Sequence, residues 1–230
     1  MNLIIDAGNT CIKLAAFKGD DPVEVCRVDY DELSKFGRFT TSYPFRRGIV
    51  SSVVDMPQSL EAAIAALPFD VVRLVPGVPP VPLRIKYATP HTLGADRLAA
   101  AVGAYAKGEG REVLVIDMGT CITYDFVNAD GEYLGGNISP GPKLRLKALN
   151  AYTSRLPLVS RHGDIPEMGD STETAIRSGV VNGIRREIEG YISDFLLKYP
   201  RLFVYLTGGV HLDLHISEKM RIFADDFIVP

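Results

Sequence analysis

Two stretches of the chain share one order of apolar and polar residues. Residues 3–13 read Leu-Ile-Ile-Asp-Ala-Gly-Asn-Thr-Cys-Ile-Lys, and residues 114–123 read Leu-Val-Ile-Asp-Met-Gly-Thr-Cys-Ile-Thr, which aligns after one deletion. An apolar run that ends in an acid, then a glycine turn and a second apolar run, predict a β-hairpin. Because half the chain separates the copies, the sequence predicts two similar lobes, and we expect Asp6 and Asp117 to face each other across a cleft.

The rest of the chain alternates predicted strands with predicted helices. The longest helix is expected over residues 172–198, where apolar side chains recur every three or four positions until Pro200 ends the helix. Such alternation predicts an α/β fold, with one lobe over residues 1–110 and the other over residues 111–230. Further strands are predicted at 48–54, 71–75 and 202–206, and further helices at 58–66, 94–107 and 144–151.

Composition narrows the class of protein. Apolar residues make up 47% of the chain and charged residues 23%, which suits a packed core. The formal net charge of −3, without a long basic run, argues against a nucleic-acid partner. No apolar stretch approaches the ~20 residues that span a bilayer, and the start of the chain lacks the features of a signal peptide. Three cysteines without a CxxC pair argue against a disulfide framework, so we expect a cytoplasmic protein without a membrane partner.

The repeated turns have the chemistry of an anion site. Gly8 and Gly119 let the backbone approach a bulky anion, and the turn amides, with the hydroxyls of Thr10 and Thr120, can donate to phosphate oxygens. Lys13 can add a point charge. The alternative is that these residues only form ordinary hairpin turns. That would be the better interpretation if the motif occurred once, but two copies in equivalent contexts favour the anion site.

The acids of the two turns need a cation if phosphate binds beside them. Asp6 and Asp117 would repel phosphate oxygens, so Mg²⁺ or its waters would have to lie between the carboxylates and the phosphates. The sequence therefore predicts a magnesium–phosphate site rather than a bare anion site.

A second candidate site begins the helix predicted at 94–107. Asp96 falls in its first turn, where the helix dipole favours the ionised carboxylate that could accept a proton from a hydroxyl. Arg97 points about 100° away and suits bidentate capture of a carboxylate. From the residues alone, helix-start electrostatics for Asp96 and a surface salt bridge for Arg97 are the simpler interpretation. Likewise, Lys143, Arg145 and Lys147 are expected to form a solvated helix face rather than a phosphate clamp.

Taken in order, these motifs carry a resemblance. Three of them resemble motifs of the acetate kinase, sugar kinase, Hsp70 and actin superfamily. The phosphate 1 motif is resembled by strand–Asp-x-Gly-Asn-Thr, the phosphate 2 motif by strand–Asp-x-Gly-Thr and the adenosine motif by strand–Thr-Gly-Gly. The match is closer to the type III pantothenate kinases, also known as Bvg accessory factor homologues. The segments at 94–97, 133–141, 148–157 and 171–179 resemble that family in order and spacing.

The resemblance implies a fold and a reaction. The fold would be the ribonuclease H-like or actin-like ATPase fold, a duplicated mixed β-sheet with flanking helices. The reaction would be ATP-dependent phosphorylation of pantothenate to 4′-phosphopantothenate, the first step of coenzyme A biosynthesis, by in-line transfer with Asp96 as the base. The pantothenate site would be lined by Tyr87, Gly94, Arg97 and Thr172. The nucleotide site would comprise Asp6, Gly8, Asn9, Thr10, Lys13, Asp117, Gly119, Thr120, Thr207, Gly208 and Gly209.

The resemblance also implies a monovalent cation and a second copy of the chain. K⁺ or NH₄⁺ would bind near Asp125, which could otherwise simply terminate a strand. A homodimer would place the partner against the pantothenate site, with the segment at Gly135-Gly136 near the interface. The sequence adds an argument for the dimer, because the helix at 172–198 carries more apolar surface than one hairpin should cover. That surface consists of Val180, Ile184, Ile188 and Ile192.

Two other functions stay open on the sequence. Another small-molecule kinase or a phosphatase of the same superfamily would hydrolyse or transfer phosphate without depending on pantothenate. A nucleotide-binding accessory protein would bind nucleotide without turnover.

Overall fold

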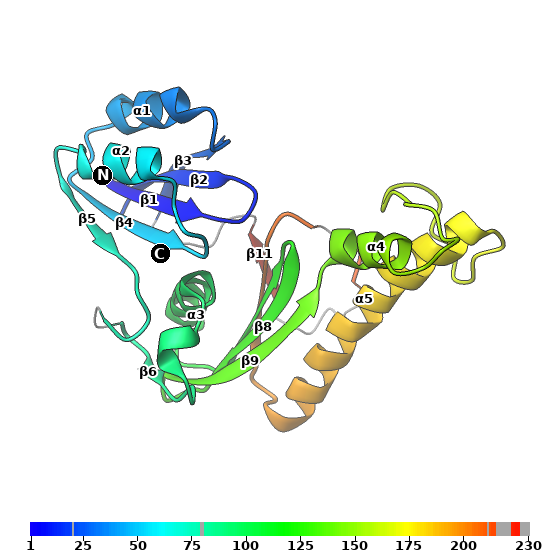
Figure 1. The fold of residues 1–230 in the computed structure, drawn as a ribbon. Coiled ribbons are helices and arrows are strands. Elements are labelled where there is room, and N and C mark those ends of the chain that lie inside the picture. The colour runs from blue at the N-terminus through cyan, green and yellow to red at the C-terminus, as the bar shows by residue number, and fades with distance from the viewer. Residues whose placement is uncertain (20, 79–80, 211, 215–221, 226–230) are drawn as a thin grey trace. The chain divides into compact units, whose positions relative to one another are not determined.

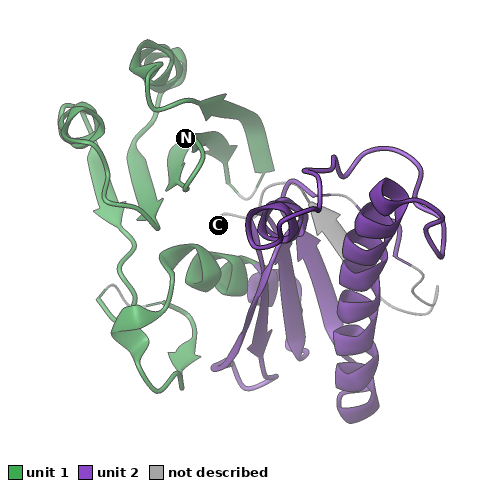
Figure 2. Cartoon of the chain, turned by 45° about the vertical axis from the view of Figure 1, so that its right-hand side comes forward, with its two compact units in different colours: residues 1–103, 229–230 green, residues 104–228 purple. Residues whose placement is uncertain are grey.

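The computed structural model describes residues 1–19, 21–78, 81–210, 212–214 and 222–225 of the chain. The chain divides into two compact units, the first within Met1–Gly103 and the second within Ala104–Ile228 (Figure 2). Each unit contains one mixed β-sheet with helices beside it (Figure 1). No helix in the described ranges has both the length and the apolar character needed to cross a bilayer.

The sheet of the first unit has the order β3-β2-β1-β4-β5. The first hairpin forms its centre, with β1 antiparallel to β2 and parallel to β4. An antiparallel edge is added by β3 and a parallel edge by β5. Its strands are β1 (Asn2–Ala7), β2 (Ile12–Lys18), β3 (Asp21–Val28), β4 (Arg47–Ser52) and β5 (Asp70–Arg73). The short β6 (Arg84–Ile85) follows β5 along the chain and is not a strand of this sheet.

The two faces of this sheet have different roles. Leu3 and Ile5 point to one face and form a core with α1 (Leu33–Ser42) and α2 (Gln58–Ala65). Side chains alternate along a strand, so Asp6 points to the opposite face. Helix α3 (Ala95–Lys107) begins on that side of the strands, after the short η1 (Pro90–Thr92) (Figure 1).

The second unit contains the second hairpin, a mixed sheet built around it and two helices. Within this unit the strands run in the order β11-β10-β7-β8-β9, with β7 antiparallel to β8 and parallel to β10. Helices α4 and α5 follow β9 along the chain. The elements are β7 (Val113–Met118), β8 (Cys121–Val127), β9 (Glu132–Pro140), α4 (Pro142–Ala151), α5 (Thr172–Lys198), β10 (Phe203–Thr207) and β11 (Ile222–Asp225).

Both sheets have the same topology. Each consists of an antiparallel three-stranded meander whose first strand also pairs in parallel with a later strand, and that strand pairs in parallel with one more. A register shift falls at Ala16/Phe17 in the first unit and at Phe126/Val127 in the second, the same place in each meander. The predicted duplicated mixed sheet with flanking helices is confirmed.

One argument from the sequence is wrong. The apolar stripe of α5, expected to exceed what its own chain could cover, is buried inside its own unit: Val180 is 5% exposed, and Ile184, Ile188 and Ile192 are 0% exposed. These side chains pack in one cluster with residues of β7, β8 and β10, including Leu114. A helix of 27 residues crosses several strands, so a whole sheet rather than one hairpin covers this stripe.

Candidate active site

The first acid turn lies between β1 and β2. Asp6 pairs across the strands with Lys13, whose ammonium lies 3.4 Å from the carboxylate. The Gly8 N–H donates to the carbonyl of Cys11 at 3.2 Å and closes the turn. Asn9 and Thr10, at the turn tip, are exposed. The turn therefore presents a hydroxyl and backbone amides to solvent beside one paired carboxylate.

Tyr30 holds this turn, and sequence reasoning did not identify it. Its hydroxyl donates to the carbonyl of Gly8 at 2.7 Å. Burial raises the pKa of the Tyr30 hydroxyl, and the charges of Asp6 and Cys11 add to the rise. The hydroxyl thus stays protonated and remains a donor. A lone tyrosine in a segment without a predicted element carries no sequence signal for such a contact.

Two carboxylates approach each other in the first unit. Burial raises the pKa of the Asp6 carboxyl, the Lys13 ammonium opposes the rise, and the carboxylate of Asp96 adds to it. The charge of Asp96 at the start of α3 therefore influences the ionisation of Asp6 in the first acid turn. Two carboxylates of like charge with one lysine suit a divalent cation, because Mg²⁺ is commonly held by one or two carboxylates together with phosphate oxygens.

The start of α3 has a fixed local geometry. Oδ1 of Asp96 accepts the backbone N–H of Arg97 at 2.8 Å, so the carboxylate lies over the helix N-terminus. A Cβ on Gly94 would lie 2.5 Å from the same oxygen, so a larger residue there would displace the Asp96 carboxylate from its present position.

Arg97 is not a surface residue. It is 6% exposed, and its guanidinium lies over the ring of Tyr87, 5.9 Å from the centroid. The surface salt bridge considered from the sequence is therefore excluded for Arg97. Three predicted substrate residues, Tyr87, Gly94 and Arg97, lie together in the first unit.

The second acid turn has close packing of its own. The Gly119 N–H donates to the carbonyl of Cys121 at 2.9 Å, and Thr120 beside it is exposed. In the sheet, Asp117 is flanked by Thr207 on the parallel strand β10. Gly208 has a φ of +98°, and a Cβ there would lie 2.4 Å from Oδ1 of Asp117.

The predicted Thr207-Gly208-Gly209 segment therefore adjoins the second acid turn. The N–H of Val210 also donates to the carbonyl of Met118 at 3.0 Å. Two motifs that are predicted to bind nucleotide and lie far apart in sequence therefore meet at the same end of β7 and β10.

Gly141 is a further member of this turn that sequence reasoning did not assign to the site. Its N–H donates to the carbonyl of Thr120 at 3.0 Å, and a Cβ on it would lie 2.5 Å from the carbonyl oxygen of Gly119. Gly141 precedes α4, so the N-terminus of that helix is joined to the turn. The Pro-Gly-Pro sequence at 140–142 was a detectable signal for a tight junction.

Lys143 and Lys147 are exposed, as predicted, but Arg145 of α4 is partly buried and is not part of a solvated face. Its guanidinium donates to Glu187 of α5, to Ser139 and to the carbonyl of Pro140. Burial works to raise the pKa of Glu187, but hydrogen bonds from Arg145, Tyr124 and Ser139 outweigh it and hold that pKa below its ordinary value. This ion pair fixes α4 against α5.

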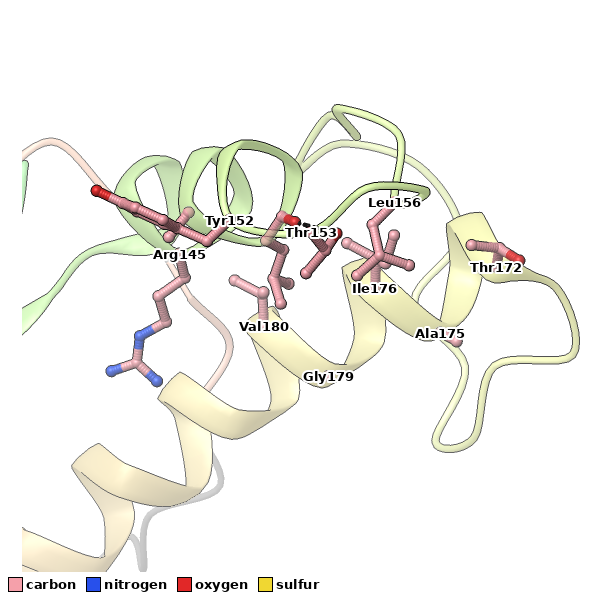
Figure 3. Close-up of a pocket in the computed structure, with 11 residues that line it drawn as sticks. Arg145, Tyr152, Thr153, Leu156, Thr172, Ala175, Ile176, Gly179 and Val180 are labelled. Atoms are coloured by element: carbon pink, nitrogen blue, oxygen red, sulfur yellow. Dashed lines mark hydrogen bonds between the residues drawn. The ribbon is translucent and has the colours of Figure 1, made fainter.

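Thr172 lies apart from the second acid turn. It is the first residue of α5, behind a capping box formed by Ser171 and Thr174. Figure 3 shows it at one end of an apolar groove of about 820 Å³ between α4 and α5. No residue of the second acid turn lines this groove. Other lining residues include Leu149, Tyr152, Leu156, Ile176 and Val180.

Asp125 is enclosed in the second unit. It is 0% exposed, and its Oδ1 accepts the hydroxyl of Tyr133 at 2.5 Å. This contact gives Asp125 a role in joining β8 to β9. In the described residues no group of three or more histidines, cysteines and acids is gathered as a metal would require. The cation role expected for Asp125 stays a prediction.

Comparisons with known proteins agree on the family. A family model described as type III pantothenate kinase matches residues 2–194. A type III pantothenate kinase from Phocaeicola vulgatus is 48% identical over 229 residues, which cover 100% of this chain and 94% of that protein.

Solved structures agree on the fold. A Baf family protein from Campylobacter jejuni matches with a TM-score of 0.58 and 19% identity over 97% of this chain and 91% of that one. An activator of 2-hydroxyisocaproyl-CoA dehydratase from Clostridium difficile, solved with bound ADPNP, matches with a TM-score of 0.51 and 14% identity over 99% and 89%. At these identities the likeness shows the fold alone, which is the predicted actin-like ATPase and sugar-kinase fold.

Substituting Gly208 tests the packing at the second acid turn. Gly208→Ala combines a positive φ with a Cβ 2.4 Å from Asp117, so we expect a loss of roughly 1–3 kcal/mol in the free energy of unfolding. The matched control is Gly190→Ala in α5, where a Cβ meets no atom within 4 Å and the helix should gain about 0.5–1 kcal/mol. Urea unfolding measures both. Equal stabilities for the two variants would contradict the packing described.

Proposed function

The chain belongs to the type III pantothenate kinase family, and from this premise we propose that it transfers the γ-phosphoryl group of ATP to the hydroxyl of pantothenate. The product is 4′-phosphopantothenate, which enters coenzyme A biosynthesis. The observation that carries the proposal is that Asp6 is paired with Lys13 and is also influenced by the charge of Asp96 within the same unit. In the proposal, Asp96 activates the hydroxyl and the turn that holds Asp6 binds phosphate.

In this reaction the protein mainly has to position the reactants and stabilise negative charge on the phosphoryl group. Phosphoryl transfer proceeds through a loose transition state, so little covalent chemistry is left to the protein. The turn amides and the hydroxyls of Thr10 and Thr120 hold phosphate oxygens, and Lys13 supplies a positive charge. Asp96 accepts a hydrogen bond from the substrate hydroxyl, orients it and takes its proton as the oxygen bonds to phosphorus.

Mg²⁺ belongs to the proposal as a partner of the phosphates. The side chains that would hold it, directly or through water, are Asp6 and Asp117. When bound, it supplies charge neutralisation at the phosphate oxygens. The raised pKa of Asp6, caused by burial and by neighbouring Asp96 against the opposition of Lys13, supports this because a cation would favour the ionised carboxylate.

In the proposal, Arg97 binds the carboxylate of pantothenate. The buried guanidinium lies over the ring of Tyr87, and its planar fork matches a carboxylate. Pantothenate carries its carboxylate at the end opposite the reacting hydroxyl. Arg97 would therefore hold the carboxylate while Asp96, one residue earlier on α3, holds the hydroxyl. Gly94 makes room for Asp96, and Thr172 is the further contact that the family resemblance implies.

Two substitutions separate these roles. We expect Asp96→Asn to lower kcat by ~10²–10⁴-fold, because it removes the group that receives the proton. Arg97→Ala should chiefly raise KM for pantothenate, because it removes binding common to the ground and transition states. A coupled assay of ADP release with ATP and pantothenate measures both, with the exposed Asp130→Asn as control. An Asp96→Asn enzyme within a few-fold of wild type would defeat the role of base.

The same assay tests the function itself. Wild-type ADP release that does not depend on pantothenate would identify a different kinase or a phosphatase. Nucleotide binding without turnover would identify an accessory protein. The proposal also places the reaction in the cytoplasm, where ATP is available and the three free cysteines stay reduced.

The proposal also includes a monovalent cation near Asp125, whose carboxylate accepts the hydroxyl of Tyr133. If Asp125 holds K⁺ or NH₄⁺, Asp125→Asn raises the K⁺ concentration for half-maximal activity several-fold, and Tyr133→Phe leaves it unchanged. If the acid only joins β8 to β9, both variants lower Tm and neither alters the response to K⁺. Activity titrated with KCl at constant ionic strength, alongside Tm, decides between the two.

A homodimer is proposed to form over the groove between α4 and α5. Figure 3 shows the apolar side chains that line it, and Tyr152 on its rim is 88% exposed. Exposed apolar surface of this kind is typical of an interaction site. The second copy would thereby adjoin Thr172, consistent with a partner that helps to wall the pantothenate site.

Light scattering tests the dimer with a matched pair of variants. Tyr152→Asp should convert the dimer to a monomer, because a charge would be buried at the interface. Leu197→Asp is the control, since Leu197 is 84% exposed on the same helix pair but does not line the groove. A monomeric wild type, or a Tyr152→Asp protein of unchanged mass, would remove the dimer from the proposal.

A further inference from the structure

Ser51 is a buried hydroxyl beside the first acid turn. It lies on β4, is 2% exposed, and its Oγ has no hydrogen-bond partner among the described residues. A buried polar group without a partner costs desolvation free energy that no bond returns, so it calls for an explanation. Sequence reasoning treated this segment only as a strand.

Register places Ser51 next to Asp6. The parallel pairing of β1 with β4 sets the two Cα atoms opposite each other, and the antiparallel pairing with β2 sets Lys13 on the other side. Neighbouring strands lie about 4.8 Å apart and paired residues share a face. Lys13, Asp6 and Ser51 therefore form one row across three strands.

The second unit repeats this arrangement with its own residues. There β10 takes the place of β4, and its register sets Thr207 beside Asp117. Thr207 is 5% exposed, comparable with Ser51. A buried residue with a hydroxyl thus stands on the parallel neighbour of the acid in both copies of the fold. The unpartnered, buried hydroxyl of Ser51 and the recurrence of a hydroxyl residue at the same register position in the second unit are independent observations.

The ion pair of Asp6 shows when a hydroxyl would be needed. In the structure the carboxylate has Lys13 at 3.4 Å. A phosphate oxygen at the same turn competes for that ammonium, since Lys13 bears one charge on a flexible stem. Once the ammonium turns to phosphate, the largely buried Asp6 carboxylate must find another donor. The Ser51 hydroxyl can rotate about its χ1 angle and supply one.

We propose that Ser51 is a positioning residue for Asp6, whose hydroxyl donates to the Asp6 carboxylate when Lys13 engages phosphate. This inference rests on the proposed function, because it assumes that the turn binds the phosphates of ATP. The bond would hold the carboxylate ionised and directed at the metal or its waters. Ser51 itself touches neither reactant.

Three variants test the proposal. Ser51→Ala removes the hydroxyl, Ser51→Thr retains it with the residue type found at the equivalent position 207, and Ser178→Ala is the control. Ser178 is also buried, at 3% exposure, and its Oγ also lacks a partner among the described residues, but it lies in α5 of the other unit. Both alanine variants remove an unsatisfied buried hydroxyl, so neither should lower Tm without nucleotide.

Function separates the variants. We expect Ser51→Ala to lower kcat/KM by about tenfold or more, because hydrogen bonds to charged groups are the stronger ones, and Ser51→Thr to restore most of it. The acid limb of the pH–kcat profile should move to higher pH in Ser51→Ala, because an ionised carboxylate loses a donor. The rise in Tm on adding ATP and Mg²⁺ should shrink as well, whereas Ser178→Ala should match wild type in every respect.

A Ser51→Ala enzyme with wild-type kcat/KM, pH profile and nucleotide-induced rise in Tm would overturn the proposal. So would a Ser51→Ala protein whose activity falls only in step with a lowered Tm, since the hydroxyl would then be structural. A wild type that fails to phosphorylate pantothenate would instead refute the proposed function. In that event the nucleotide-induced shift in Tm still decides whether Ser51 supports the acid turn.

Discussion

A carboxylate partly withdrawn from water, near the end of the central strand, is the constraint around which each sheet is arranged. Desolvation penalises the charged form of such a group, so its neighbours must supply donors or room for a cation. Asp6 has Lys13 on one strand and the closed turn of Gly8 beyond it. Glycines follow from the same constraint, because at Gly94 and at Gly208 a carboxylate oxygen occupies the space that a Cβ would need.

Duplication preserved the backbone but not the charges. In both sheets the acid pairs antiparallel with the next strand and parallel with a later one. The antiparallel partner is Lys13 in the first unit and Thr123 in the second. One architecture therefore offers a positive charge at one turn and a neutral hydroxyl at the other.

Most of the fold could be read from the sequence, where pattern and chemistry agree. The helix expected at 172–198 has those bounds, since its apolar spacing is strong and Ser171 caps it. Missed elements had weak or conflicting signals. Strand β3 is an edge strand with Pro22 near its start and mostly exposed side chains. Helix α1 contains Gly37 and adjacent threonines, poor helix formers that only the packing of its phenylalanines overrides.

The parts of the candidate site that could be predicted are those in which a short sequence motif contains all the residues that act together. The acid turns, the start of α3 and the Thr-Gly-Gly segment all occur as short, ordered strings. Contacts set by register or by tertiary packing were not predictable, which is why Tyr30, Ser51 and Gly141 were missed. The number of apolar residues on α5 was read correctly from the sequence, but what covers them depends on the width of the sheet beneath.

The attachment of α4 at two points has a mechanical consequence. The residue that precedes it is joined to the second acid turn by the bond from the Gly141 amide to the Thr120 carbonyl, and Arg145, four residues further on, is tied to Glu187 of α5. The helix cannot slide along its axis without stretching one of these connections. Solvent exchange of the Gly141 amide therefore reports on the α4–α5 groove as well as on the turn, so that one backbone proton monitors two surfaces of the same unit.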